Sequence, residues 1–263
     1  MAGNDSLAKV RIDQVTKVFQ SRGEDVVALN GVSLDIAENE FVCVVGPSGC
    51  GKSTLLNIIG GLEKPTTGSA YLDGEIITEP GPERGVIFQQ YALFPWLTVK
   101  GNVEFGLKLQ GKGGKEASRI ADEYIEKVNL TQFTNAYPKE LSGGMKQRVA
   151  IARAYAVKPQ VLLMDEPFGA LDAQTRTQLQ SELLLTWESD RTTCFFITHD
   201  VEEAVMLAQR VIIMSARPGR IKEIVNIDIP HPRNQETKME KEFLEIKNHI
   251  WKQVYQEYLE ERK

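Results

Sequence analysis

The nine residues from 46 to 54 constrain the fold of this chain more than any other stretch. They follow the pattern G-x-x-x-x-G-K-S and read, in order, Gly46, Pro47, Ser48, Gly49, Cys50, Gly51, Lys52, Ser53 and Thr54. The apolar run before them, residues 41–45, predicts a buried strand, and the segment after them predicts a helix. A strand, a glycine-rich turn and a helix form the context in which this motif binds phosphate.

The residue types in this phosphate loop (residues 46–54) explain why it suits an anion. Gly46, Gly49 and Gly51 lack a Cβ, so the backbone can curl tightly around a ligand. Successive backbone N–H groups and the N-terminus of the following helix direct positive charge toward that ligand. Lys52 can then reach the β- and γ-phosphates of a nucleotide, and the Ser53 hydroxyl is placed to bind Mg²⁺. The alternative interpretation is a glycine-rich surface turn.

Composition limits the function classes that this chain can serve. Its 263 residues, 42% of them hydrophobic, suffice for one sizeable core or for a main domain with a lobe. A net charge of −5 argues against nucleic-acid binding through bulk charge. The sequence contains no apolar run long enough to predict a membrane span, and its N-terminus carries no apolar signal region. Cys43, Cys50 and Cys194 show no metal-like spacing, which predicts reduced thiols in a cytosolic protein.

Short apolar segments on either side of the phosphate loop predict further strands and turns. An isolated aromatic such as Phe19 is most simply a core residue, and stacking on adenine is the alternative. Residues 66–74 predict a hairpin, and an apolar strand beyond it ends at Gln89. The remaining predicted strands cover residues 10–12, 26–29, 32–36 and 85–88, with a turn at residues 21–23.

Residues 91–99 have an unusual composition, with three aromatic side chains and a proline but no helical or strand periodicity. Two interpretations stay open from the residues alone: a buried loop of a small lobe, or an apolar docking surface. The polar segment that follows, residues 112–127, predicts a helix belonging to a lobe set on the main sheet.

A second glycine turn, at Ser142, Gly143 and Gly144, precedes a strongly helical segment at residues 145–154. Ser142 is a suitable N-cap, and the start of this helix is a second candidate for anion binding. Two such helix ends in one chain suggest either two phosphate contacts or one site shared between two copies.

Two further strands end in residues that can do chemistry. Asp165 and Glu166 follow the apolar run 161–164, where an acid near a phosphate loop holds Mg²⁺ and a second acid can orient the attacking water. Two acids that cap a turn are the alternative. His199 follows the run 194–198, at the strand edge where ligands bind in open parallel sheets, although a lone histidine is more often structural.

The last third of the chain predicts a helix start, two strands and a terminal helix. Asp200 with Glu203 predicts a capped helix over residues 201–209. Late strands are expected at residues 211–214 and 224–227. The amphipathic helix predicted at residues 239–263 is expected to pack on its own domain, with a dimer or partner role as the alternative. Its apolar face comprises Phe243, Ile246, Ile250, Val254 and Tyr258.

Taken in this order, residues 9–225 resemble the ATP-binding subunit of an ABC transporter. The motifs that carry the resemblance are residues 46–54 (Walker A), Gln89 (Q-loop), residues 141–145 (signature), residues 161–166 (Walker B), residues 170–172 (D-loop) and His199 (switch). The resemblance implies an α/β P-loop NTPase fold with a RecA-like parallel core and an N-terminal antiparallel β subdomain. It implies one nucleotide-binding domain over residues 1–263, with an inserted helical subdomain at about residues 91–157.

The resemblance also implies roles for single residues, with ATP and Mg²⁺ as cofactors. Phe19 would stack on adenine, and residues 46–54 would bind the phosphates. Ser53, Gln89 and Asp165 would hold Mg²⁺, Glu166 would be the catalytic base, and His199 would contact the γ-phosphate. The residues that would reach the nucleotide of an opposite subunit, or lie at the dimer seam, are Ser142, Gly143, Gly144 and Asp172.

Within the family, the chain is most similar to importers of the nitrate, sulfonate and taurine type, on residues 83–89, 93–99 and 215–221. This implies an ATPase at the cytoplasmic face of the inner membrane that powers uptake of a small anion or organic solute. The implied partners are two transmembrane permease subunits, which dock beside Gln89, a second ATP-binding subunit and, indirectly, a periplasmic or lipoprotein solute-binding protein. The alternative functions are a soluble ABC ATPase and a small-molecule kinase, and the latter gives no reason for residues 141–144.

Overall fold

The computed structural model describes residues 8–20 and 23–260, which form two compact units. The first unit combines the described residues up to 81 with those from 191 onward, and the second comprises residues 82–190. The segment 91–157, predicted as an inserted helical subdomain, lies wholly inside the second unit. Each unit is described by itself.

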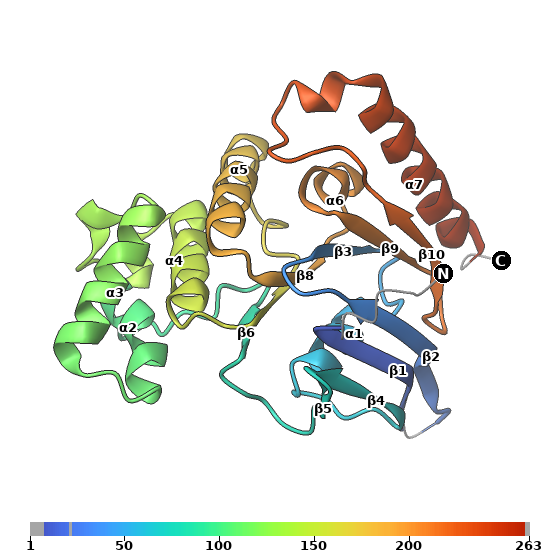
Figure 1. The fold of residues 1–263 in the computed structure, drawn as a ribbon, viewed down its shortest axis with the longest axis horizontal. Coiled ribbons are helices and arrows are strands. Elements are labelled where there is room, and N and C mark those ends of the chain that lie inside the picture. The colour runs from blue at the N-terminus through green and yellow to red at the C-terminus, as the bar shows by residue number, and fades with distance from the viewer. Residues whose placement is uncertain (1–7, 21–22, 261–263) are drawn as a thin grey trace, which may run out of the picture. The chain divides into compact units, whose positions relative to one another are not determined.

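An antiparallel sheet of order β2-β1-β4-β5 begins the first unit (Figure 1). Its strands are β1 (Val10–Phe19), β2 (Val26–Ile36), β4 (Thr67–Leu72) and β5 (Glu75–Ile76). The prediction of separate strands at residues 26–29 and 32–36 is wrong, because β2 continues through Gly31, whose φ is 62°. The predicted hairpin is present, but its turn lies at residues 73–74. Of the turn predicted at residues 21–23, Ser21 and Arg22 lie outside the described residues.

The second sheet of this unit has the order β10-β9-β3-β8. Every residue of β3 (Phe41–Val45) is buried, as the apolar run predicted. It pairs in parallel with β8 (Thr193–Ile197) on one side and with β9 (Arg210–Met214) on the other, and β10 (Ile221–Asn226) adds an antiparallel edge. The carboxyl ends of β3, β8 and β9 therefore meet at one edge.

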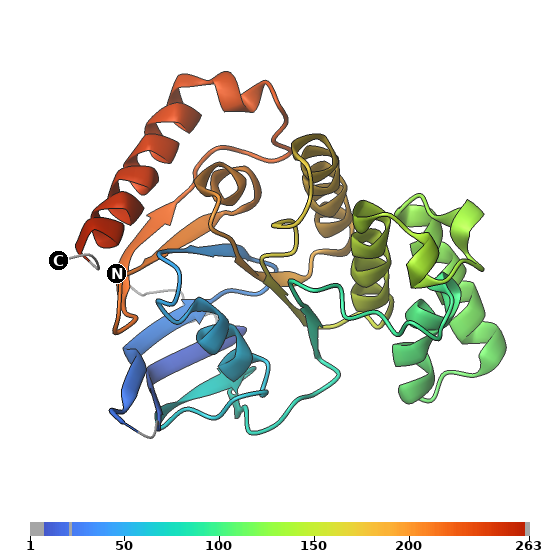
Figure 2. The same ribbon diagram turned by 180° about the vertical axis from the view of Figure 1, so that it is seen from behind.

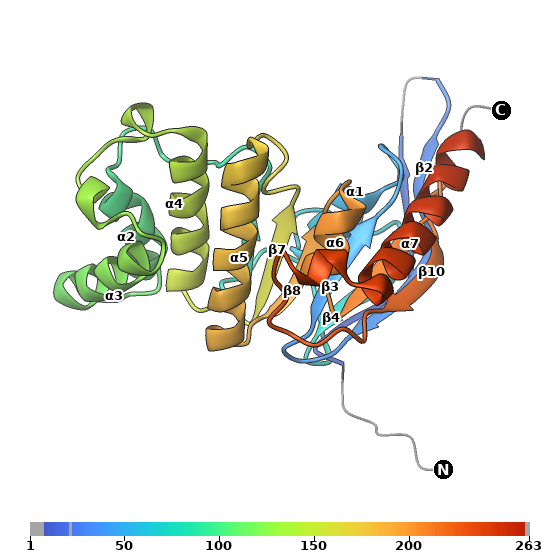
Figure 3. The ribbon, with the colours of Figure 1, turned by 90° about the horizontal axis from the view of Figure 1, so that it is seen from above.

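Helices cover both sheets of the first unit. Helix α1 (Lys52–Ile59) contacts β1, β2 and β4 as well as β8, and Figure 2 shows it lying over the antiparallel strands. Helix α6 (Val201–Leu207) packs on β3, and α7 (Lys241–Glu260), preceded by the short 3₁₀ helix η3 (Thr237–Met239), packs on α6 and β9 (Figure 3).

Helix α7 follows the predicted packing only in part. Phe243 and Ile250 are fully buried, as the apolar periodicity indicated. Tyr258, assigned to the same buried face, is instead 41% exposed, while the neighbouring Glu257 is only 6% exposed. Glu257 lies seven residues after Ile250, as Ile250 does after Phe243, so the helical repeat places Glu257 on the buried face. The prediction chose Tyr258 because it is apolar. Residues 261–263 of the predicted helix lie outside the described part.

The second unit combines one pair of parallel strands with a group of helices. Strand β6 (Arg84–Ile87) pairs in parallel with β7 (Val161–Asp165). Helices α2, α3 and α4 pack on one another, and α5 runs beside α4 (Figure 3). Their bounds are α2 (Val99–Leu109), α3 (Gly114–Lys127), α4 (Gly143–Ala156) and α5 (Ala173–Asp190), with 3₁₀ helices η1 (Thr131–Phe133) and η2 (Pro138–Glu140).

Two of these helices were not predicted. Helix α2 contains Gly101 and Gly106, whose low helix propensity hides it. Helix α5 carries Leu179, Leu183 and Trp187 four residues apart, all buried, and this spacing was a usable signal. In the part of the chain that the structure covers, none of the helices has both the length and the apolar character of a membrane span.

Candidate nucleotide site

The phosphate loop leads into a helix whose first turn is uncapped by side chains. Helix α1 begins at Lys52, and its N-cap, Gly51, has a left-handed backbone with φ 99° and contributes no capping side chain. The first turn of the helix holds no acidic residue either. The first backbone N–H groups of α1 therefore suit an anionic ligand.

Glycine is required in this loop for two separate reasons. Gly49 and Gly51 both lie in the left-handed region, with φ of 76° and 99°, which a Cβ would strain. A Cβ on Gly51 would also lie 2.7 Å from the carbonyl oxygen of Ala28 on β2. Close packing against β2 therefore also requires glycine at position 51, in addition to any role of the loop in binding phosphate.

The side-chain amino group of Lys52 lies against the phosphate loop. The side chain is buried, and its Nζ donates to the carbonyl oxygens of Gly46 and Pro47, both at 2.8 Å. Cys50 is 1% exposed, and burial raises the pKa of its thiol although the Lys52 ammonium opposes this. Ser53 lies exposed on the first turn of α1. An ammonium group and a hydroxyl group at the start of this helix match the needs of a nucleotide phosphate and its metal ion.

His199 lies at the same sheet edge as the phosphate loop. Strands β3 and β8 pair in parallel with Val44 opposite Ile197, so Gly46 and His199 each follow the carboxyl end of adjacent strands. This is the edge at which open parallel sheets bind ligands.

Asp200, the next residue, caps helix α6. Its Oδ1 accepts hydrogen bonds from the N–H groups of Glu202 and Glu203, at 2.9 and 3.2 Å. The backbone N–H of Asp200 donates to the hydroxyl of Thr198 at 3.0 Å.

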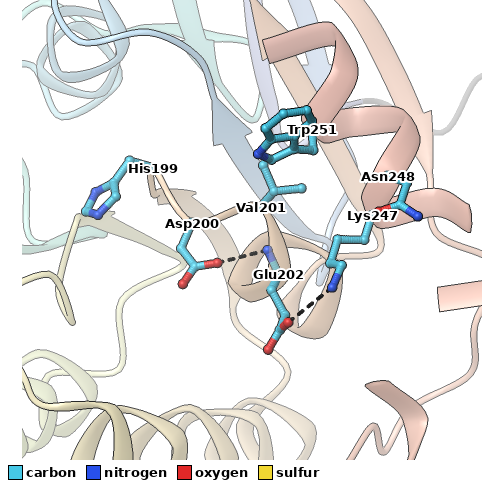
Figure 4. A pocket seen from close by; sticks show the side chains of 7 residues that line it. All are labelled: His199, Asp200, Val201, Glu202, Lys247, Asn248 and Trp251. Atoms are coloured by element: carbon cyan, nitrogen blue, oxygen red, sulfur yellow. Dashed lines mark hydrogen bonds and ion pairs between the residues drawn. The ribbon is translucent and has the colours of Figure 1, made fainter. Parts of the chain in front are cut away.

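An open pocket of about 530 Å³ lies between α6 and α7, with His199 at one end and Trp251 and Lys247 at the other (Figure 4). Glu202 lines this pocket. Its carboxylate oxygens lie 3.5 Å from the Nζ of Lys247 and 2.9 Å from the Nζ of Lys238. Burial raises the pKa of this carboxyl, but its two lysine partners outweigh that effect and the net shift is downward. Within the pocket, Glu202 and Lys247 therefore offset each other's charge.

Phe19 is not the core residue that its isolated occurrence predicted. It ends β1 with 39% of its surface exposed, and the Nζ of Lys17 lies 4.9 Å from the ring centroid. An exposed aromatic face is the state that a stacking role requires.

In the second unit, Gln89 and Glu166 come together. Strands β6 and β7 pair with Ile87 opposite Met164, so both residues follow the carboxyl end of adjacent strands. The Nε2 of Gln89 lies 3.4 Å from Oε2 of Glu166. Glu166 has a left-handed backbone with φ 44°, a conformation rare for a residue with a side chain and concentrated at functional sites. Asp165 ends β7 beside it.

The second glycine turn starts α4 as predicted. Ser142 is the N-cap, and its hydroxyl accepts from the N–H of Met145 at 3.3 Å. A Cβ on Gly143 would lie 3.0 Å from the Tyr91 hydroxyl, and one on Gly144 would lie 2.6 Å from Thr175. Side-chain packing therefore requires these glycines, in addition to any ligand.

Asp172 starts helix α5. One carboxylate oxygen accepts from the N–H of Thr175 at 3.0 Å, and hydrogen bonds from Thr175 hold the pKa of the Asp172 carboxyl below its usual range. Its side chain thus has a capping role within the unit, which the sequence had not indicated.

Two polar residues that sequence reasoning missed hold the segment after Gln89. Arg153 on α4 donates to the carbonyl oxygens of Ala92 and Tyr91, at 2.6 and 3.2 Å. The fully buried amide of Asn102 donates to three carbonyl oxygens of residues 94–98 and accepts from the N–H of Phe94 at 2.8 Å. An asparagine facing the core of an amphipathic helix was the available signal for this role.

The segment that these residues hold presents the indole ring of Trp96 to solvent. Trp96 is 70% exposed and lies 5.6 Å from the ring of Phe94, which lies 4.4 Å from that of Phe105. Of the two interpretations left open for residues 91–99, the buried loop does not hold for Trp96. We call Phe94, Trp96 and Phe105 the aromatic cluster.

A glycine-rich phosphate loop, a capped signature turn and an acid pair at a strand end thus occur in one chain, and the family model for ABC transporters matches residues 29–169. The chain belongs to the ABC transporter family. As an ABC ATPase it binds and hydrolyses ATP, and its α/β P-loop NTPase fold is the one the sequence predicted.

Named relatives of this ABC ATPase cover most of its length. It is 53% identical over 242 residues to an uncharacterized ABC transporter ATP-binding protein of Methanocaldococcus jannaschii, with 92% of this chain and 90% of that protein covered. It is 51% identical over 237 residues to the nitrate import ATP-binding protein NrtD of Synechocystis, covering 89% of each. It is 48% identical over 244 residues to the aliphatic sulfonates import ATP-binding protein SsuB of Bacillus cereus, covering 93% and 95%.

Among solved structures, the cassette resembles a dimeric ATP-binding cassette in a post-hydrolysis state, bound to ADP and Pi. The TM-score is 0.75 at 37% sequence identity, covering 84% of this chain and all of the other.

Proposed function

We propose that this chain powers an importer for a small anion or organic solute of the nitrate, sulfonate, taurine or bicarbonate kind. The relatives named for nitrate and sulfonate import support this proposal. The observation that carries it is the segment after Gln89, which leads from a residue hydrogen-bonded to Glu166 to the exposed aromatic cluster. An ABC ATPase that is not coupled to transport would not need exposed aromatic side chains on the segment that follows Gln89.

The residues for nucleotide and metal binding fit ATP with Mg²⁺. Lys52 and the loop N–H groups would bind the β- and γ-phosphates, and Phe19 would stack on adenine. Ser53, Gln89 and Asp165 offer hydroxyl, amide and carboxylate oxygens, the hard ligands that Mg²⁺ prefers. A bound Mg²⁺ would neutralise phosphate charge during hydrolysis.

Glu166 would act as the base that accepts a proton from the attacking water, and His199 would contact the γ-phosphate. The left-handed backbone of Glu166 supports a special orientation for this side chain, because such strain persists only where the surroundings impose it. Gln89 contacts that carboxylate, so a change at Glu166 during hydrolysis would shift Gln89 and the segment that follows it.

A second ATP-binding subunit, identical or a sister chain, would complete each nucleotide site. Ser142, Gly143 and Gly144 would contact the γ-phosphate held by the opposite subunit, with Asp172 at the seam. The exposed position of Ser142 at the start of α4 and the dimeric arrangement named for the solved neighbour support this. ATP would then hold two subunits together, and hydrolysis would release them.

The remaining partners follow from an import function. Two transmembrane permease subunits would dock on the aromatic cluster, placing the chain at the cytoplasmic face of the inner membrane. A periplasmic or lipoprotein solute-binding protein would deliver the solute. Nothing in this proposal involves nucleic acid, in keeping with the net charge of −5.

Reconstitution tests this function directly. The chain, co-purified with the integral membrane proteins that associate with it and placed in proteoliposomes, should drive ATP-dependent accumulation of labelled nitrate, bicarbonate, sulfonate or taurine. The same complex carrying Glu166→Gln is the control and should accumulate none. Purification of an active ATPase that associates with no integral membrane protein would overturn the proposal.

A further inference from the structure

The loop of residues 215–220, which joins β9 to β10, is wedged against the phosphate loop. Its Gly219 donates an N–H to the carbonyl of Ala28 at 3.1 Å and accepts from the N–H of Asn30 at 3.0 Å, so it pairs with β2. A Cβ on Gly219 would lie 2.0 Å from the carbonyl oxygen of Cys50. A side chain at position 219 therefore does not fit against Cys50.

Arg217 adds a hydrogen bond at the preceding peptide. Its Nε donates to the carbonyl oxygen of Gly49 at 3.1 Å. In a planar trans peptide the C=O and the N–H point to opposite sides, so a fixed Gly49 carbonyl also fixes the direction of the Cys50 N–H. By the same rule, Gly219 against the Cys50 carbonyl sets the Gly51 N–H. These N–H groups belong to the turn that would receive phosphate, and in this structure the Cys50 N–H donates to the carbonyl oxygen of Pro47 at 3.4 Å.

The other side of this loop is anchored by the C-terminal helix. Glu257 of α7 is 6% exposed, and its Oε2 accepts from the backbone N–H of Ala216 at 2.9 Å. Its Oε1 lies 2.7 Å from the Nζ of Lys222 on β10. Both carboxylate oxygens are therefore committed to holding the two ends of the loop that carries Arg217.

We infer that helix α7 sets the conformation of the phosphate loop through this loop, with Glu257 and Arg217 as positioning residues for nucleotide binding. Contacts run without a gap from Glu257 to Ala216, then through the adjacent Arg217 to Gly49. The inference rests on the proposed role of residues 46–54, and it gives the terminal helix a function in the nucleotide site. A partner that shifts α7 would change nucleotide affinity without touching the nucleotide.

Cys50 provides a readout that needs no nucleotide. Its thiol is 1% exposed inside the phosphate loop, so its alkylation rate measures how often that loop opens. In the nucleotide-free subunit, Arg217→Ala and Glu257→Ala should each raise N-ethylmaleimide labelling of Cys50 about tenfold, as expected for loss of one charged hydrogen bond. Arg217→Lys and Glu257→Gln should restore part of the protection.

Matched controls separate local positioning from general loosening. Arg220→Ala removes an exposed arginine of the same loop, and Glu245→Ala removes an exposed glutamate of the same helix. Both should label at the parent rate. Cys43 and Cys194, buried in β3 and β8, should stay protected in every variant. Equal acceleration at all three cysteines, or no acceleration at Cys50, would overturn the inference.

Nucleotide binding provides the second measurement. Binding of a fluorescent ATP analogue should weaken about tenfold in Arg217→Ala and Glu257→Ala, with KM for ATP rising in parallel and kcat falling less than twofold. Unchanged affinity alongside faster Cys50 labelling would refute a role in nucleotide binding. A parent chain that bound no nucleotide would instead remove the proposed role of the phosphate loop, while the labelling result still decides the contact with α7.

Discussion

The Nε2 of Gln89 lies 3.4 Å from the Oε2 of Glu166, although 77 residues separate them in the chain. The contact exists because β6 and β7 run in parallel and in register, so that both side chains follow the same edge of the strand pair. It ties the proposed catalytic base to the segment that carries the aromatic cluster.

Glu166→Gln should stop hydrolysis while preserving ATP binding. The amide keeps the shape of the carboxylate but cannot accept a proton from water, which removes a general base worth about 10²–10⁴ in rate. ATPase assays and size-exclusion chromatography with saturating ATP should show a stable dimer with turnover reduced at least 100-fold. A variant that stays monomeric under these conditions would argue against the shared site.

Lys52→Ala should weaken nucleotide binding about 10- to 100-fold. The ammonium is held at the loop by Gly46 and Pro47, and removing charged hydrogen bonds to phosphate costs roughly 1.5–3 kcal/mol. Titration with a fluorescent ATP analogue measures this, and the exposed Lys64→Ala variant is the control for loss of one positive charge. Equal affinities in the parent chain and Lys52→Ala would remove the assignment of Lys52.

Trp96→Ala should leave the ATPase activity of the isolated subunit within twofold of the parent and uncouple transport in proteoliposomes. The indole is 70% exposed, so its removal costs little folding energy but deletes apolar surface from the aromatic cluster. Leu109→Ala, at a side chain 76% exposed on the same unit, is the matched truncation. A lower melting temperature for Trp96→Ala than for Leu109→Ala would show a packing role instead.

Arg233→Ala should lower the free energy of unfolding by about 3 kcal/mol, because several buried carbonyls lose a charged donor together. The guanidinium is 4% exposed and donates to the carbonyl oxygens of four residues: Val205, Ala208, Ile227 and Ile229. Urea denaturation measures the change, with the exposed Arg119→Ala as control. Arg233→Lys should recover little, since one ammonium cannot reach carbonyls on several sides. A variant as stable as Arg119→Ala would contradict this account.

His231 should make stability depend on pH between about 4 and 6.5. Burial and, second, the nearby Arg233 charge lower the pKa of His231 to about 4, while the unfolded chain titrates near its ordinary value. The unfolded state then binds more protons in this window, so stability rises with pH and is lost as pH falls through it. Urea midpoints at pH 7 and pH 4.5 should lie closer together for His231→Gln than for the parent.

The parts of this protein whose chemistry is local could be predicted from the residues alone. The phosphate loop needs its glycines, Lys52 and Ser53 within nine consecutive residues, and the strand before it is recognisable from five apolar residues in a row. Ser142 at the start of α4 and Asp200 at the start of α6 are likewise local, since a cap and its partner lie two or three residues apart.

The tertiary structure alone decided which distant residues meet. Arg217 and Gly49 lie 168 residues apart, and their contact depends on β9 lying beside β3. Helical spacing places Glu257 on the buried face, seven residues after Ile250, but only the tertiary structure supplies Ala216 and Lys222 as partners for its carboxylate. Periodicity reports which face of an element is apolar, whereas strand register and helix docking fix the neighbours of that face, and both depend on the whole chain.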